Sequence, residues 1–126
     1  MSISDYIADL RGEVEKLDTF GFAERIDFSD ELRAGKQAII KAEVDLVDGS
    51  TLVIKEYIDA RYGIEKMSYA YHLQRKDGSL VFRYDNAAHK PSLGFEQHKH
   101  MEKGKIFEAP SPDIRELLDE VIRHLE

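Results

Sequence analysis

The sequence predicts an α+β fold: a single antiparallel sheet of about four to six strands, with an N-terminal and a C-terminal helix packed on one face. Near both ends of the chain, apolar residues recur at three- and four-residue steps, as in amphipathic helices. Between them, apolar and polar residues alternate, which is typical of strands with one buried face. Two Asp-Gly pairs, at 48–49 and 77–78, interrupt the alternation and indicate hairpins. A chain of 126 residues fits a single domain, 1–126.

The first helix is expected over residues 3–18. Ser2 or Ser4 can cap its first turn, because a side-chain hydroxyl accepts hydrogen bonds from amide groups that have no carbonyl partner there. Gly21 lies just beyond the expected end, where a left-handed residue is common. The apolar side of this helix consists of Ile3, Tyr6, Ile7, Leu10, Val14 and Leu17.

The alternation predicts strands over residues 22–28, 36–47, 51–58, 67–75 and 80–86, with a polar connection over 29–35. Between the second and third strands, a three-residue loop with Gly49 left-handed places Leu52 and Ile54 on the apolar face. A two-residue turn would place Lys55 on that face instead. The three-residue loop is therefore expected.

For the hairpin around Asp77-Gly78, a two-residue turn is expected, because it pairs Tyr71 with Tyr84 on one face. The same register places His72 directly across from Arg83 on the opposite face. The other pairs expected from this register are Leu73 with Phe82 and Ala70 with Asp85.

The last helix follows residues 87–110, the least regular part of the sequence. Ser111 is expected to cap it, with Pro112 in the first helical position and Asp113 at the positive end of the helix dipole. Its apolar face consists of Ile114, Leu117, Leu118, Val121, Ile122 and Leu125.

The composition excludes several classes of protein. A net charge of −7 argues against binding polyanions over the whole surface, although residues 66–107 carry eight Lys or Arg against four Asp or Glu. The absence of cysteine excludes disulfides and thiol chemistry and fits the cytoplasm. No segment has the apolar character of a signal peptide or a membrane span.

The stretch from Tyr69 to His100 has the composition of a functional site, because it holds four of the five histidines. His98 and His100 lie on the same side if their segment is extended. Paired imidazoles in an irregular segment have no packing reason to be there, which favours a function. For Arg83 and Asp85, a structural ion pair is the commoner outcome.

Several short motifs follow one another in this stretch. They are Tyr69-Ala70-Tyr71-His72, Asp77-Gly78, Arg83-Tyr84-Asp85-Asn86, His89 and His98-Lys99-His100. Together they resemble the TumE-like toxin family of bacterial and archaeal toxin–antitoxin systems. The sequence departs from the family pattern at Ala88, where proline is usual, and at Lys90, where a second histidine is usual. The resemblance implies a growth-inhibiting toxin whose partner is a cognate antitoxin encoded next to it, usually with a helix-turn-helix.

The first chemical hypothesis is a metal-independent ribonuclease without a cofactor. Cleaving RNA through its own 2′-hydroxyl needs a base, an acid and a cation for the developing phosphorane charge. Histidine suits the first two roles because its pKa lies near neutrality, and the planar guanidinium of arginine suits the third. The expected catalytic set is His72, Arg83, Asp85, His98 and His100. The residues expected to contact RNA are Tyr71, Tyr84, Asn86, Lys90 and Lys99, although Asn86 is also a residue that closes turns.

Two alternatives remain open. His89, His98, His100 and Asp85 are a candidate ligand set for a divalent metal, which would make the protein a metal-dependent hydrolase. Alternatively, the domain is a non-catalytic protein-binding module that docks a partner through its open sheet face or an edge strand. Self-association into a homo-oligomer is compatible with all three hypotheses.

Overall fold

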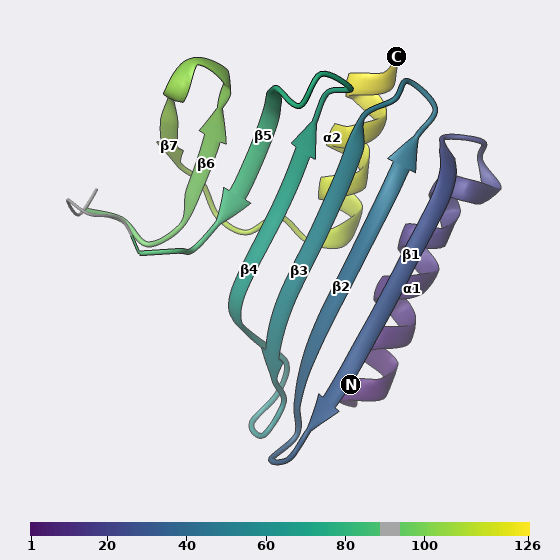
Figure 1. Cartoon of the computed structure of the whole chain (residues 1–126). Coiled ribbons are helices and arrows are strands. Elements are labelled where there is room, and N and C mark those ends of the chain that lie inside the picture. Colours follow the sequence, from purple (N-terminus) through teal and green to yellow (C-terminus); the bar gives the residue numbers. More distant parts are fainter. Residues whose placement is uncertain (89–93) are drawn as a thin grey trace.

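The computed structural model describes residues 1–88 and 94–126. One α-helix precedes the run of strands and one follows it, as expected from an α+β fold (Figure 1). The elements are α1 (Ile3–Thr19), β1 (Ala23–Arg33), β2 (Gln37–Leu46), β3 (Thr51–Asp59), β4 (Glu65–Gln74), β5 (Leu80–Asp85), β6 (His98–Met101), the short 3₁₀ helix η1 (Glu102–Gly104), β7 (Ile106–Glu108) and α2 (Ile114–Leu125).

The strands form one antiparallel sheet in which spatial order equals chain order, from β1 to β7. Within the described residues the sheet has seven strands, more than the four to six that the sequence predicts. The additional strands are β6 and β7, which come from the segment expected to be irregular. β1 also runs on to Arg33 through the expected polar connection, because the backbone of residues 29–33 continues to pair with β2.

The β2–β3 hairpin confirms the predicted three-residue loop. Val44 pairs with Leu52, and Gly49 closes the loop with a φ of 86°. Positive φ is open to glycine at little cost and disfavoured for other residues, so this position requires glycine. In consequence, the apolar residues of β2 and β3 share the face that carries the helices.

The β4–β5 hairpin has the predicted strand register but a different turn. Tyr71 pairs with Tyr84 and His72 with Arg83, as expected. However, the Arg75 amide donates to the Ser79 carbonyl, so the loop has three residues rather than two. The ladder then shifts by one residue between Leu73 and Gln74, because β5 contains an extra residue there. This bulge offsets the longer loop and restores the register beyond it.

Both helices lie on the same face of the sheet, as predicted (Figure 1). The core is formed by the inward side chains of β2 to β5 together with the apolar sides of the two helices. The cap of α1 is Ser2, one of the two predicted residues. The cap of α2 is Asp113 rather than Ser111, because the Ser111 hydroxyl instead contacts Lys66 Nζ. In the part of the chain that the structure describes, no helix covers the other face of the sheet (Figure 1).

Among the described residues, no helix combines the length and the apolar character that crossing a membrane requires.

Candidate functional site

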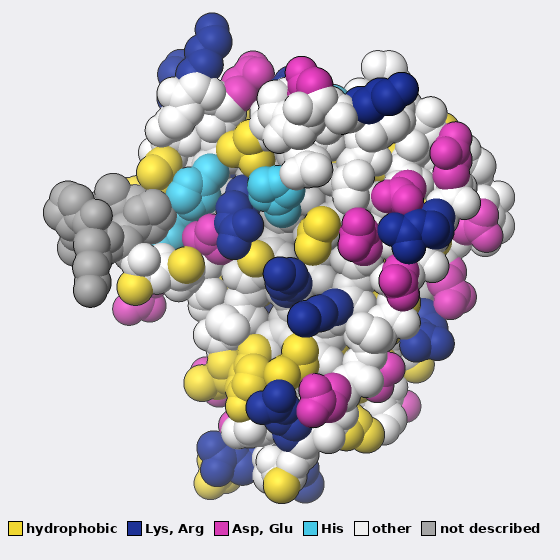
Figure 2. All heavy atoms as spheres, viewed as in Figure 1, with side chains coloured by type: hydrophobic (Ala, Val, Ile, Leu, Met, Phe, Trp, Pro, Cys, Tyr) yellow, Lys and Arg dark blue, Asp and Glu magenta, His cyan; other side chains and the backbone are white. Residues whose placement is uncertain are grey.

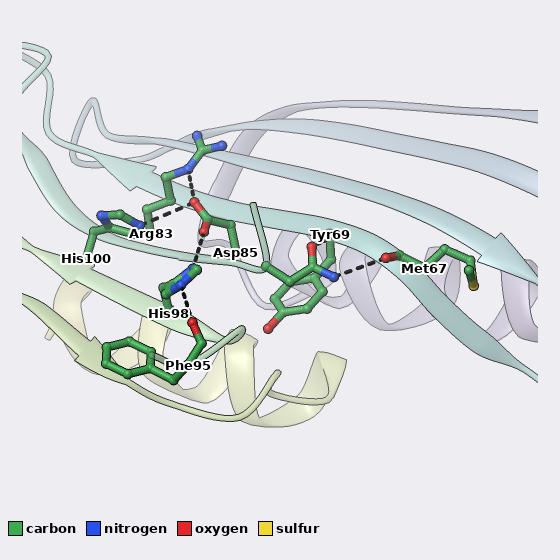
Figure 3. Close-up of polar contacts among 8 residues, drawn as sticks. Met67, Tyr69, Arg83, Asp85, Phe95, His98 and His100 are labelled. Carbon is green, nitrogen blue, oxygen red and sulfur yellow. Dashed lines mark hydrogen bonds and ion pairs between the residues drawn. The ribbon is translucent and has the colours of Figure 1, made fainter. Parts of the chain in front are cut away.

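The candidate site centres on the carboxylate of Asp85, at the end of β5. Its side chain is almost fully buried, with 5 % of its surface exposed. Antiparallel pairing between β5 and β6 brings Asp85 opposite His98 and Arg83 opposite His100. Four of the five residues predicted to be catalytic therefore meet on the open side of the sheet, and three of them converge on Asp85 (Figure 3).

Asp85 holds its neighbours through both carboxylate oxygens. Arg83 donates a hydrogen bond from Nε to Oδ2 over 2.8 Å, and Nε2 of His100 lies 3.4 Å from the same oxygen. Nδ1 of His98 lies 3.2 Å from Oδ1. A buried carboxylate needs such donors, because taking a charge out of water without partners is strongly unfavourable. Here Arg83 and His98 supply hydrogen bonds, and His100 adds a contact at ion-pair distance.

The pKa of Asp85 lies below its ordinary value. Burial by itself raises this pKa, because it disfavours the charged carboxylate. The hydrogen bonds from Arg83 and His98, together with the electrostatic effects of His100 and Arg83, outweigh the effect of burial. Asp85 is thus an anion at neutral pH and can orient imidazoles and a guanidinium.

His98 is fixed from both sides of its ring and is only 2 % exposed. Its Nε2 lies 2.9 Å from the backbone carbonyl of Phe95, and its Nδ1 faces Asp85. Each ring nitrogen therefore faces an acceptor oxygen of a different segment. The geometry gives His98 a structural task, which is to hold Asp85 and the segment around Phe95 in place.

His100 and Arg83 are more accessible than His98, with 19 % and 41 % of their side chains exposed. Only Nε of Arg83 bonds to Asp85, so its two terminal NH₂ groups extend beyond the carboxylate (Figure 3). A guanidinium held in this way can offer paired donors to the oxygens of a phosphate. These two residues are therefore placed to contact a ligand.

His72 lies on the other side of Arg83, on β4. Burial lowers the pKa of its imidazole, and the positive charge of Arg83 lowers it further, whereas the contact between Nε2 and Gln74 Oε1 opposes the shift. Nδ1 is buried, and none of the described residues hydrogen-bonds to it. Such a polar atom is unusual in a folded protein and calls for an explanation. Because its pKa lies below the ordinary value of about 6.5, His72 is a neutral imidazole at pH 7.

Three of the residues expected to contact RNA lie on the helix side of the sheet instead. Tyr71 is 2 % exposed. The hydroxyl of Tyr84 donates to Glu120 on α2, and Lys99 forms an ion pair with the same carboxylate at 2.8 Å. Asn86 lies beyond the end of β5, where its side-chain oxygen accepts from the Tyr69 amide and its NH₂ group donates to the Met67 carbonyl. Asn86 therefore continues the pairing of β4 past the end of its neighbour strand.

His89 and Lys90, two further predicted site residues, lie outside the described residues. Of the candidate metal ligands, Asp85, His98 and His100 do come together, with potential ligand atoms within 4.8 Å of one another. Arg83 and Phe95 already bond to atoms of this cluster, so a metal ion would have to displace those contacts.

Hollows border the cluster on two sides. Among the described residues, the larger hollow, of about 820 Å³, is lined by three glutamates, Glu65, Glu96 and Glu108, and by one lysine, Lys66. On the open face, two smaller hollows of about 390 and 210 Å³ share Lys55 and Arg83. Opposite charges attract and like charges repel over such distances, so an anionic ligand fits the open face better.

Lys55 and its cross-strand neighbour Lys41 were absent from the residues singled out from the sequence. A signal was available, because the predicted three-residue loop at Gly49 already places these two lysines opposite each other. Two cations in directly opposite positions of a sheet repel each other, so such a pair indicates a candidate binding surface.

A family model described as Toxin TumE matches residues 14–126 of the chain. No match was found among curated proteins or among solved structures.

Proposed function

This chain belongs to the TumE toxin family and is the toxin of a toxin–antitoxin system; we propose that it acts by cleaving RNA without a metal ion. The observation that supports this most directly is a row of three side chains across the sheet. His72, Arg83 and His100 occupy directly opposite positions on β4, β5 and β6. Two imidazoles therefore flank one guanidinium on an open surface.

The spacing of this row suits a phosphodiester. Neighbouring strands lie about 4.8 Å apart, so the two imidazoles arise from backbone positions roughly 10 Å apart with Arg83 midway. A phosphate that contacts Arg83 would then have one imidazole on each side. General acid–base cleavage of RNA needs this arrangement, because the attacking and leaving oxygens lie on opposite sides of the phosphorus.

The environments of the two imidazoles support different roles. His72 is neutral at pH 7 and would act as the base that removes the proton of the 2′-hydroxyl. Because Gln74 Oε1 accepts from Nε2–H in the resting contact, this role requires the other tautomer, with the proton on Nδ1 and the lone pair on Nε2. The 2′-oxygen then attacks phosphorus, and the 5′-oxygen leaves with a proton from His100. The products are a 2′,3′-cyclic phosphate and a free 5′-hydroxyl. Asp85 and His98 would act as positioning residues for His100 and Arg83.

The test is cleavage of a fluorescent single-stranded oligoribonucleotide by the purified protein in EDTA, with the new termini identified by mass spectrometry. We expect 2′,3′-cyclic phosphate ends and a loss of at least about 100-fold in rate for His72→Ala and for His100→Ala, the usual contribution of a general acid or base. His124→Ala is the matched control, because His124 contacts Asp48 from α2, away from the row. Full activity of both site variants would contradict the proposal.

A metal-dependent hydrolase is the second candidate, because Asp85, His98 and His100 could supply three ligands. The same assay separates the two candidates. Activity that EDTA abolishes and a divalent ion restores would favour the metal site over the acid–base row. Direct titration with Zn²⁺ or Mn²⁺ in a calorimeter, compared between the parent and His100→Ala, would show whether these residues bind the ion.

The partner that we expect is the cognate antitoxin, with a helix-turn-helix, and the site of action is the cytoplasm. Expression from a repressed promoter should arrest growth, and the neighbouring antitoxin gene should relieve the arrest. Growth arrest by His72→Ala and His100→Ala variants that no longer cleave RNA would instead favour the non-catalytic binding module.

A further inference from the structure

Lys41 on β2 and Lys55 on β3 are directly opposite each other on the open face, and both side chains are exposed. Like charges in directly opposite positions destabilise a sheet. In the described part of the chain, neither ammonium group lies within ion-pair distance of a carboxylate, whereas nearby acidic groups are already engaged. Arg25 forms ion pairs with Asp27, Glu43 and Asp45 at the edge of the sheet. The lysine pair is thus an uncompensated positive site on a protein with a net charge of −7.

The lysine pair is continuous with the row proposed to cleave RNA. A hollow of about 210 Å³ is lined by Lys55, Ala70, His72 and Arg83. Ala70 lies between Lys55 and Asp85 in the cross-strand order, and its small side chain leaves space above the sheet. Figure 2, which views the open face, shows Lys and Arg side chains extending from the histidines over the middle of the sheet.

Beyond the lysines, the surface becomes apolar. The second hollow, of about 390 Å³, includes Lys41 and Lys55 together with Ile39, Tyr57 and Met67. Tyr57 and Ile39 are cross-strand neighbours, and the Tyr57 hydroxyl donates to the Gln37 side chain, which fixes the ring. A fixed aromatic ring beside cations is the combination that binds single-stranded nucleic acid: the cations contact phosphates, and the ring stacks on an unpaired base.

We propose that Lys41, Lys55 and Tyr57 bind the strand of a single-stranded RNA next to its cleaved phosphate. This inference rests on the proposed function and specifies its substrate class. From Lys41 on β2 to Arg83 on β5 there are three strand spacings, roughly 14 Å at about 4.8 Å each. A stacked strand rises about 3.4 Å per nucleotide, and an extended strand more. The RNA-binding track, which is the surface from Lys41 through Lys55 and Tyr57 to Arg83, therefore spans about two to four nucleotides. The substrate is therefore an oligonucleotide longer than a dinucleotide.

Binding is measured separately from cleavage. The probe is a fluorescein-labelled 12-nucleotide oligouridine with 2′-methoxy groups, which cannot be cleaved because it lacks the attacking hydroxyl. We expect the Lys41→Gln/Lys55→Gln double variant to bind about tenfold more weakly by anisotropy. The slope of log affinity against log salt should fall by about 1.4, since each phosphate contact on a single strand contributes about 0.7. The control is Lys76→Gln/Lys105→Gln, which makes the same charge change at two exposed lysines outside both hollows.

Substitutions of Tyr57 provide the second test of the proposal. Tyr57→Leu keeps an apolar side chain but removes the ring, and we expect binding about tenfold weaker, in line with the loss of one stacked base. Tyr57→Phe keeps the ring and removes only the hydroxyl that bonds to Gln37, so we expect near-parent affinity. Equal weakening by both lysine double variants, or unchanged affinity of Tyr57→Leu, would overturn the proposed track.

Cleavage assays separate this inference from the proposed function. At subsaturating concentration, we expect the Lys41→Gln/Lys55→Gln variant to lose more of its cleavage rate, relative to the parent, on a 12-nucleotide RNA than on a uridylyl-uridine dinucleotide. If the parent cleaves RNA and the lysine variant binds and cleaves the long strand normally, the track is wrong while the ribonuclease stands. If no RNA is cleaved but the lysine and tyrosine variants lose binding as expected, the ribonuclease is wrong while the RNA-binding track stands.

Discussion

Asp85 and His98 lie opposite each other on adjacent strands, with Oδ1 of the carboxylate 3.2 Å from Nδ1 of the imidazole. The far nitrogen of the same ring bonds to the Phe95 carbonyl, so His98 links β5 to the segment that leads into β6. Because both groups are buried, the contact is shielded from water and salt. The contact therefore contributes both to the geometry of the candidate site and to the stability of this end of the sheet.

Replacing Asp85 with asparagine should destabilise the protein by about 1–3 kcal/mol, because an amide has nearly the same shape but has only one oxygen to accept hydrogen bonds, whereas both carboxylate oxygens of Asp85 accept one. Urea unfolding monitored by circular dichroism measures the change. Asp45→Asn is the control, since Asp45 pairs with Arg25 on the exposed surface and should contribute at most about 1 kcal/mol. Equal effects of the two substitutions would contradict a special role for Asp85.

The low pKa of Asp85 also predicts how stability depends on pH. Because the folded carboxyl has a lower pKa than the unfolded one, the unfolded chain takes up a proton first as pH falls. The stabilisation is therefore fully present above the unfolded pKa of about 3.9 and is lost as pH falls through the lower folded value. The difference in unfolding free energy between the parent and Asp85→Asn should shrink below about pH 4. A difference that stays constant from pH 7 to pH 3 would contradict this linkage.

The row of His72 and Arg83 could be predicted from the sequence even though the turn could not. Pairing Tyr71 with Tyr84 in the core fixes the register, and a three-residue loop with a bulge gives the same register as a two-residue turn. Burial of side chains thus determines which residues face each other, while the loop conformation adjusts to it.

The strands β6 and β7 could not be predicted in the same way. They are short, and one of the two inward residues of β6 is Lys99, whose ammonium group pairs with Glu120 on α2; the other is Met101. A charged residue at an inward position removes the apolar alternation on which strand prediction depends. Without β6, the sequence could not show that His98 and His100 meet Asp85, because that contact depends on pairing between residues distant in the chain.

His72 should titrate with a pKa below the ordinary value of about 6.5, because burial and then Arg83 disfavour its charged form. The histidine Cε1–H signals in NMR spectra give the pKa, with His72→Gln used for assignment. Arg83→Gln should raise the pKa, since it removes a nearby cation, although the burial of the ring remains. A pKa at or above 6.5 in the parent would remove the main support for His72 as the base.

His98 and His100 should differ in what their substitution changes. His98→Asn should lower stability by about 1–3 kcal/mol, because it disrupts two buried hydrogen bonds. His100→Asn should change stability less, since the ring is partly exposed and lies 3.4 Å from Asp85, and should instead lower the rate of RNA cleavage. Chemical denaturation and initial rates, measured on the same preparations, give both quantities. A stable but inactive His98→Asn together with an active His100→Asn would reverse the assigned roles.

A second cluster of buried polar side chains, on the helix side of the sheet, should determine how the stability of the protein changes at alkaline pH. The hydroxyls of Tyr6 and Tyr71 donate to the two oxygens of Glu56, and Lys66 Nζ donates to the Tyr71 oxygen. Tyr71→Phe should destabilise the protein by about 1–3 kcal/mol, because it leaves one oxygen of the buried Glu56 carboxylate without its donor and removes one of the acceptors of Lys66 Nζ. Tyr62→Phe, at a side chain that is 98 % exposed, should have no measurable effect.

The pH dependence follows from the same contacts. Burial, followed by the charge of Glu56, raises the pKa of Tyr71 far above its ordinary value of 10. The unfolded chain therefore loses its tyrosine proton first as pH rises, so stability declines once pH exceeds about 10. Unfolding in urea between pH 8 and pH 11 should show this decline in the parent and a smaller one in Tyr71→Phe. Parallel curves for the two proteins would indicate that the hydroxyl of Tyr71 is not held in its protonated form by the fold.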